Sequence, residues 1–452
     1  METQPTLPLS LIMNRIGCFL DRKTWNNLRL CSRDMNEESK LARDFVWPSS
    51  VKILDSRVSA LWVSPGDHGY TMRALLGIER DGQPVGQALE VWNKLSGRQR
   101  DRVVMTEPCL SCTFSPDGKY LACAYALFES IMIRIHVLGD VSSGEPAIIE
   151  HRETHIHERD ESVAIYSIGF TPDSRKVLCL DDTQDGSTNQ ALLILDLSTM
   201  NDPGAVLQYS VHVMSRTKCQ VLPFTTRDGS ASGIYHALLY DNLYRHEWDR
   251  ANISVLEIAD RRVLQEHHSD ADEGMFVWLR HLRQLPTHPL LFAGLMHTFD
   301  PSTEKHKLWL YLYRLSNNEL YMCSRNLVNV GHPRAVERAG SNVDNTRIAW
   351  FPDGKSLALY LPSDPTLPVG PFQYHPGEVV LYDKSVAFSA HPAFVTPSPS
   401  STKAQLIAKV NQQLRNTTVL PQLSRPCFLY IFPDGKSIAI ATKTNHLQII
   451  SL

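Results

Sequence analysis

The sequence has no uninterrupted apolar run of about 18 residues, the length at which a helix is read as a candidate to cross a bilayer. Its first residues also lack the basic segment and the long apolar core of a secretory signal peptide. The formal net charge at pH 7 is only -3, so no basic surface for a nucleic acid is indicated. We therefore expect a protein of the cytoplasm, the nucleus or both, which binds neither membrane nor nucleic acid.

The motifs of common enzyme classes are missing as well. The sequence contains no Gly-x-Ser-x-Gly nucleophile elbow and no dinucleotide-binding fingerprint. Gly-Lys-Ser occurs at Gly354 and Gly435, but the earlier glycine that a phosphate-binding loop needs is replaced by Ala349 and by Tyr430. The histidine-rich run at 151–161 lacks the helical His-Glu-x-x-His spacing of a zinc site. We expect a non-enzymatic protein without a cofactor.

Cysteine pairs suited to metal binding are scarce too. Cys109 and Cys112 have the spacing of half a zinc site, but no second pair follows at the distance that a zinc ribbon needs. The nine cysteines are scattered, and several lie in apolar, strand-like runs, among them Cys112, Cys123, Cys179 and Cys427. This distribution favours reduced thiols in the core of a protein in a reducing compartment.

What the sequence does have is a repeat. One pattern begins as F-S-P-D-G-K, F-T-P-D-S-R, F-P-D-G-K and F-P-D-G-K at Phe114, Phe170, Phe351 and Phe432. In each copy proline presets φ for a tight turn, aspartate bonds its own backbone, and a glycine such as Gly118 supplies the positive φ that closes the turn. Apolar runs stand on both sides, so each copy predicts a two-stranded β-hairpin.

The repeated hairpins predict seven units. We place their turns at Pro65, Pro116, Pro172, Asp228, Pro289, Pro352 and Pro433. A third apolar strand follows several of them and ends at Asn93, Asp196, Asp260 and Asp383. The last unit has only three strands, so we expect residues 50–55 to supply its fourth and to cover an open sheet edge.

This order of elements resembles the WD-repeat β-propeller, in which four-stranded blades surround a central channel. The glycine doublets of kelch propellers are absent, since the sequence contains no Gly-Gly. The resemblance implies a mainly β protein in which residues 49–452 form a seven-bladed propeller closed by its N- and C-terminal strands.

Residues 1–48 follow a different, helical pattern, with apolar residues at Leu9, Ile12, Ile16 and Leu20. The segment resembles an F-box, from Leu7-Pro8 at the start of the first helix to the Ser32-Arg33 pair. This resemblance implies a small all-α module that binds the Skp-type adaptor of a cullin-RING ubiquitin ligase. The adaptor-binding residues it implies are Leu7, Pro8, Ile12, Ile16, Leu20, Trp25 and Leu28. Alternatively, these helices only pack on one face of the ring.

A protein partner is expected on one face of the propeller. The connections between second and third strands are long in four consecutive units, at 181–189, 241–250, 297–305 and 362–377. Residue types that anchor interfaces occur in two of them, and we predict as partner-binding residues Tyr244, Arg245, Trp248, Arg250, Phe372 and Tyr374. The alternative is that these are ordinary solvated loops. A Pro- and Ser-rich insertion at 393–415, whose face the sequence does not assign, is expected to carry a helix.

The order of the two parts is also similar to that of F-box proteins, and this resemblance implies a substrate-recognition subunit of a cullin-RING ubiquitin ligase. The helical module would bind the adaptor and the propeller an unidentified protein substrate. The alternative function is a WD-repeat scaffold that assembles a complex without ubiquitin chemistry.

Overall fold

The computed structural model describes most of the chain beyond residue 49. The described residues are 50–53, 57–64, 71–80, 83–93, 98–105, 109, 111–126, 131–140, 146–156, 164–182, 189–198, 207–212, 220–225, 235–242, 251–257, 262–268, 276–300, 302–303, 305–316, 319–328, 346–361, 368–370, 373–374, 377–385, 393–416, 426–442 and 447–452. The segment that resembles an F-box lies outside them.

The described residues form seven four-stranded antiparallel sheets and one two-stranded sheet. The first sheets comprise β2 (Arg57–Val63), β3 (Thr71–Arg80), β4 (Gln83–Asn93) and β5 (Arg98–Met105); β6 (Ser111–Phe114), β7 (Tyr120–Ala126), β8 (Ile131–Leu138) and β9 (Ile148–Ile156); and β10 (Ala164–Phe170), β11 (Lys176–Asp182), β12 (Asn189–Asp196) and β13 (Leu207–His212). The next comprise β14 (Gln220–Thr225), β15 (Tyr235–Asn242), β16 (Ala251–Glu257) and β17 (Arg262–His268); and β18 (Phe276–Leu285), β19 (His288–Asp300), β20 (Lys305–Ser316) and β21 (Glu319–Leu327). The last comprise β22 (Arg347–Trp350), β23 (Ser356–Leu361), β26 (Glu378–Ser385) and β27 (Ala393–Val395); and β1 (Ser50–Ile53), β30 (Leu447–Ser451), β29 (Ser437–Thr442) and β28 (Pro426–Ile431), while β24 (Pro368–Gly370) pairs with β25 (Gln373–Tyr374).

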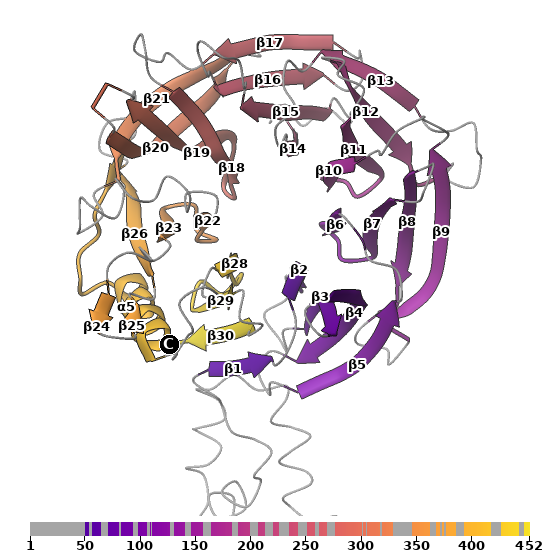
Figure 1. Ribbon diagram of the computed structural model, residues 1–452, viewed down its shortest axis with the longest axis horizontal. Coiled ribbons are helices and arrows are strands. Elements are labelled where there is room, and N and C mark those ends of the chain that lie inside the picture. The colour runs from indigo at the N-terminus through magenta and orange to yellow at the C-terminus, as the bar shows by residue number, and fades with distance from the viewer. Residues whose placement is uncertain are drawn as a thin grey trace, which may run out of the picture.

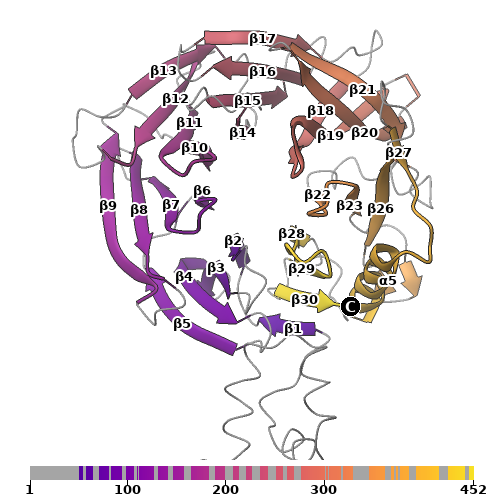
Figure 2. The ribbon, with the colours of Figure 1, turned by 180° about the vertical axis from the view of Figure 1, so that it is seen from behind.

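The sheets stand in chain order around a ring, and the strands nearest its centre are β2, β6, β10, β14, β18, β22 and β28 (Figure 1). The view from behind shows the same closed arrangement (Figure 2). The protein is therefore a mainly β, WD-repeat-like propeller, as the repeated hairpins predict.

Strand β1 is out of chain order in its sheet, because it pairs with the C-terminal strand β30. Ser50 lies opposite Ile450 and Ile53 opposite Leu447 in this antiparallel pair. Strand β1 thus completes the sheet that contains β30. It covers the edge of β30 that would otherwise be open.

The core lies between neighbouring sheets, because the middle strands are buried on both faces. On β7, Leu121 and Cys123 pack toward the β2–β5 sheet, whereas Ala122 and Ala124 pack toward the β10–β13 sheet. All four are 0% exposed. Side chains alternate across a strand, so a strand that is apolar at every position is the type that such a two-sided core requires.

The repeated Pro-Asp-Gly turns have the geometry that their sequence predicts. The carboxylate of Asp117 accepts bonds from Ser115 Oγ at 2.6 Å and from the Lys119 amide at 3.1 Å. The Gly118 amide donates to the Ser115 carbonyl oxygen at 2.9 Å, with φ at 71°. The corresponding aspartates, each of which accepts the amide of the residue two further on, are Asp173, Asp353 and Asp434.

One copy of the turn replaces the glycine with Ser174, which keeps a positive φ of 60°. A serine in this left-handed region is strained relative to glycine. Its Oγ accepts a bond from the Asp117 amide at 3.3 Å, so it joins the β10–β13 sheet to the turn of the preceding sheet.

The turn predicted around Pro289 is misplaced. Leu285 pairs directly with His288, so the tight turn consists of Pro286 and Thr287, and Pro289 belongs to β19. The pattern Pro-Thr-His-Pro contains two prolines, and the first of them forms the turn.

One described helix, α5 (Thr402–Asn416), packs against β26 and β30 and confirms the predicted helical segment. Strand β27 pairs only with the end of β26, from Asp383 to Ser385. The side chain of Asn411 bonds both the amide and the carbonyl oxygen of Val379 on β26, at 2.7 Å and 2.9 Å. The helix therefore covers the part of the β26 edge that the short β27 leaves open.

Candidate functional site

Most of the predicted site residues lie outside the described part of the chain. All seven predicted adaptor-binding residues precede Ser50 and lie outside the described residues. Of the predicted partner-binding residues, Tyr244, Arg245, Trp248, Arg250 and Phe372 also lie outside the described part. Tyr374 falls in β25, where only the backbone is described. These assignments therefore stay predictions.

The strands that flank the partner-binding segments leave the sheets at a common edge. In a meander, the connections between second and third strands lie at the end opposite the first hairpin turns. The second strands end there at Ala126, Asp182, Asn242, Asp300 and Leu361, and we call this end of the sheets the distal edge. Asn242 pairs with Ala251 and Leu361 with Glu378, so both predicted segments begin and end at the distal edge.

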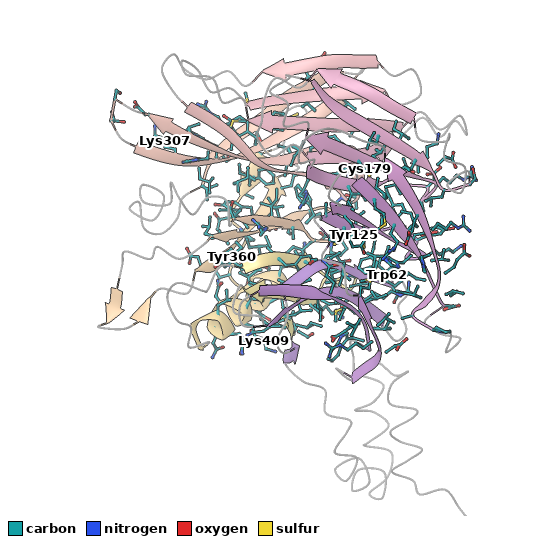
Figure 3. All side chains as sticks on the ribbon, turned by 45° about the vertical axis from the view of Figure 1, so that its right-hand side comes forward. Trp62, Tyr125, Cys179, Lys307, Tyr360 and Lys409 are labelled. Carbon is teal, nitrogen blue, oxygen red and sulfur yellow. The ribbon has the colours of Figure 1, made fainter. Side chains whose placement is uncertain are left out.

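An extra hairpin is inserted at this edge between β23 and β26. Pro368 on β24 pairs with Tyr374 on β25. Figure 3 shows the two strands standing clear of the sheets, on the same side of the picture as Lys307 near the start of β20. This hairpin gives the molecule a projecting element at the distal edge.

The long loop predicted at 297–305 is mostly strand. Strand β19 continues to Asp300 and β20 begins at Lys305, with Asp300 opposite Lys305. Asp300 Oδ1 accepts bonds from the Ser302 amide at 2.9 Å and its hydroxyl at 2.6 Å, and Oδ2 accepts one from the Thr303 hydroxyl at 2.7 Å. These bonds lower the pKa of Asp300 to about 2. The unit carries a long hairpin with a short tip in place of a loop.

The opposite ends of the sheets, which carry the Pro-Asp-Gly turns, form the turn edge. There Arg73, only 3% exposed, donates hydrogen bonds to the carbonyl oxygens of Gly118 and Gly139. Its guanidinium lies 5.2 Å from the ring centroid of Trp62, whose Nε1 lies 3.5 Å from the Pro116 carbonyl oxygen. Burial lowers the pKa of Arg73, against the opposing charge of Asp140.

This arginine joins the β2–β5 sheet to the next turn, a role that nothing in the spacing of the sequence indicates. The described contacts of Arg73, Trp62 and Ser174 connect sheets to one another. These contacts are structural, so they give no sign of a partner surface at the turn edge.

Exposed apolar side chains occur on the outer strands of two adjacent sheets. Tyr321 and Met322 on β21 and Val395 on β27 are each exposed by nearly half, and β21 and β27 are in contact. We call these exposed side chains the rim of β21 and β27. Sequence reasoning missed them because isolated apolar residues in a strand give no sign of facing outward.

Within the described ranges, no group of three or more His, Cys, Asp and Glu side chains is placed to hold a metal ion. No helix in the same part of the chain is long and apolar enough to span a membrane.

Comparison with known proteins shows the fold alone. No protein-family model and no curated protein matches the sequence. Among solved structures, the chain is similar to hydrazine synthase of Kuenenia stuttgartiensis, with 14% identity, a TM-score of 0.50, and coverage of 87% of this chain and 95% of that one. It is also similar to the β-propeller domain of Cps50 (Swd1) of Myceliophteria thermophila, with 10% identity, a TM-score of 0.44, and coverage of 89% and 99%.

Proposed function

We propose that this protein is a non-enzymatic substrate receptor of a cullin-RING ubiquitin ligase in the cytoplasm or nucleus. Residues 1–48 form an F-box-like module that binds a Skp-type adaptor. Residues 49–452 form a seven-bladed propeller, one blade for each four-stranded sheet, that binds a protein substrate. Neither part requires a cofactor, a nucleic acid or a membrane.

The observation that carries the proposal is the pairing of β1 with β30, beginning at Ser50. A helical module that ends at residue 48 is then joined to the ring by almost no linker. A short tether limits the distances that the two parts can adopt. This suits a receptor that must hold a bound substrate at a restricted distance from the ligase.

The distal edge supports the choice of substrate surface. The segment that holds the predicted anchors Arg245, Trp248 and Arg250 lies between Asn242 and Ala251, at the same edge as the projecting β24–β25 hairpin. Arginine and tryptophan are enriched among residues that dominate binding energy at interfaces. An arginine pair there also suits an acidic or phosphorylated motif.

The test is affinity purification of the full chain from cells, compared with two variants. We expect the wild type to recover the adaptor, the cullin and a substrate. Leu20→Ala with Trp25→Ala should lose the adaptor and cullin but keep the substrate. Arg245→Ala, Trp248→Ala and Arg250→Ala together should lose the substrate but keep the adaptor.

Two outcomes would contradict this assignment. Recovery of a partner without any adaptor or cullin would identify the protein as a scaffold unrelated to ubiquitin. Recovery of the substrate by the triple variant at the wild-type level would move the binding surface away from the distal edge, for instance to the rim of β21 and β27.

A further inference from the structure

Three cysteines from separate parts of one hairpin unit meet between the first two sheets. Cys112 on β6 lies directly opposite Cys123 on β7 in the strand register, so their side chains share a face. Cys109, which precedes β6, packs against the same apolar cluster. Its Sγ donates a hydrogen bond to the Ser111 carbonyl oxygen at 3.4 Å. The thiols of Cys112 and Cys123 and the side chain of Gln87 on β4 are near enough to influence its ionisation.

The three thiols differ in access to solvent. Cys123 is 0% exposed, whereas Cys109 and Cys112 are partly exposed. Cys109 is also outside the strand, next to the connection from β5 to β6. Because Ser111 pairs with Ala124 near the end of β7, this connection belongs to the distal edge. A small solute can therefore reach Cys109 more readily than its deepest neighbour.

The neighbouring thiols also distinguish Cys109 chemically. Hydrogen bonds from Cys112 and Cys123 hold the pKa of Cys109 well below its ordinary value, and the same contacts raise the pKa values of Cys112 and Cys123. A thiolate is the nucleophilic form of cysteine. The cluster thus contains one partly exposed sulfur whose ionisation is favoured over that of its two neighbours.

We propose that Cys109 is a modification site for hydroperoxides, at which oxidation joins Cys109 to Cys112 in a disulfide. The Cys109 sulfur attacks one oxygen of hydrogen peroxide, the O–O bond breaks, and the departing hydroxide takes a proton to become water. Cys109 is left as a sulfenic acid. The Cys112 sulfur then attacks the Cys109 sulfur, the S–S bond forms, and the S–O bond breaks with release of a second water. The two thiols lose two electrons in total, which the peroxide accepts.

Cys112 rather than Cys123 resolves the sulfenic acid for two reasons. Cys112 is partly exposed and close to Cys109 in the chain, so release of water and movement of Cys109 need little rearrangement. Cys123 is fully buried, on the same face of β7 as the buried Tyr125, which is labelled in Figure 3.

The test uses the full, reduced chain treated with hydrogen peroxide, followed by alkylation of free thiols and mass spectrometry. Cys323 on β21 is an internal control, because it is also partly exposed but burial raises its pKa. We expect Cys109 to lose its free thiol about tenfold faster than Cys323. Cys109 and Cys112 share the tryptic peptide 103–119, which should become lighter by two hydrogens, whereas a link to Cys123 would join two peptides.

Two variants identify the resolving thiol. Cys112→Ser should accumulate a sulfenic acid at Cys109 that dimedone traps, and Cys123→Ser should still form the Cys109–Cys112 link. The proposal is overturned if Cys109 is oxidised no faster than Cys323, or if Cys109 becomes linked to Cys123 in the wild type.

Discussion

At the scale of single residues, the same turn has different neighbours in different sheets. Gly118 and Gly435 both have positive φ, at 71° and 61°. A Cβ atom on Gly118 would overlap the indole of Trp62, whereas one on Gly435 would meet only Pro352 Cδ at 3.8 Å. The two glycines therefore separate the cost of the backbone conformation from the cost of close packing.

We predict that Gly118→Ala destabilises the protein more than Gly435→Ala. The positive φ costs each variant about 1 kcal/mol, and displacement of the Trp62 ring adds about 1–3 kcal/mol to the first. Chemical denaturation of both variants measures the difference in free energy of unfolding. Equal losses would show that the contact of Trp62 with Gly118 is not tightly packed.

Acid sensitivity is a second property that a single residue explains. His136 is 4% exposed, and neither ring nitrogen has a hydrogen-bond partner among the described residues. Burial lowers its pKa to about 4, helped by the charges of Arg134 and His151 and opposed by Cys109 and Glu153. Below the ordinary histidine pKa, the unfolded chain binds a proton at this residue that the folded protein does not bind. The free energy of unfolding therefore falls as pH drops toward 4.

We predict that His136→Leu removes part of this loss. The pKa of His136 is shifted from 6.5 to about 4. As pH drops through this range, the free energy of unfolding should fall more steeply in the wild type than in the His136→Leu variant. The difference in slope is at most about 1.4 kcal/mol per pH unit. Unfolding titrations at several pH values measure it, and parallel curves for the two proteins would contradict the neutral, buried histidine.

At the scale of elements, most local signals predict the structure, whereas several side-chain contacts between strands and sheets do not follow from the sequence. The Pro-Asp-Gly turns and helix α5 follow from residue types within a few positions. The loop predicted at 297–305 is wrong, because polar His297 and Thr298 lie in β19 and are only 1% and 8% exposed. Thr298 Oγ1 accepts a bond from Trp309 Nε1 at 3.1 Å, a partner that only the strand pairing brings near.

The thiol cluster also depends on strand pairing that the local sequence does not show. Sequence spacing relates Cys109 to Cys112, but Cys123 reaches them only through the register of β6 and β7. Likewise, Arg73 and Trp62 meet the turn at Gly118 because two sheets are adjacent in the ring. Contacts between sheets depend on geometry that no local pattern records.

The helix that covers the edge of β26 gives a prediction at this scale. Replacement of Asn411 by alanine leaves the amide and carbonyl oxygen of Val379 without their side-chain partner. We expect a loss of about 1–3 kcal/mol in the free energy of unfolding. Gln412→Ala is the matched control, because Gln412 is an exposed amide on the same helix. A loss no larger than that of the control would show that the Asn411 hydrogen bonds do not stabilise the edge of β26.

At the scale of the whole molecule, the ring depends on a strand from the other end of the chain. Deletion of residues 45–55 removes β1 and leaves β30 with an open edge. We expect a melting temperature lower by roughly 2–5 °C and faster aggregation, whereas deletion of residues 1–44, which keeps β1, should change neither much. If both deletions melt like the full chain, the pairing of β1 with β30 does not stabilise the ring.

The central claim is that the segment before β1 binds a Skp-type adaptor, and calorimetric titration of purified adaptor into the full chain tests it most directly. We predict saturable binding that Leu20→Ala and Trp25→Ala each weaken by about 2 kcal/mol, with unchanged melting temperatures. Absence of binding to the folded wild type, or equal affinity in the folded double variant, would contradict the claim.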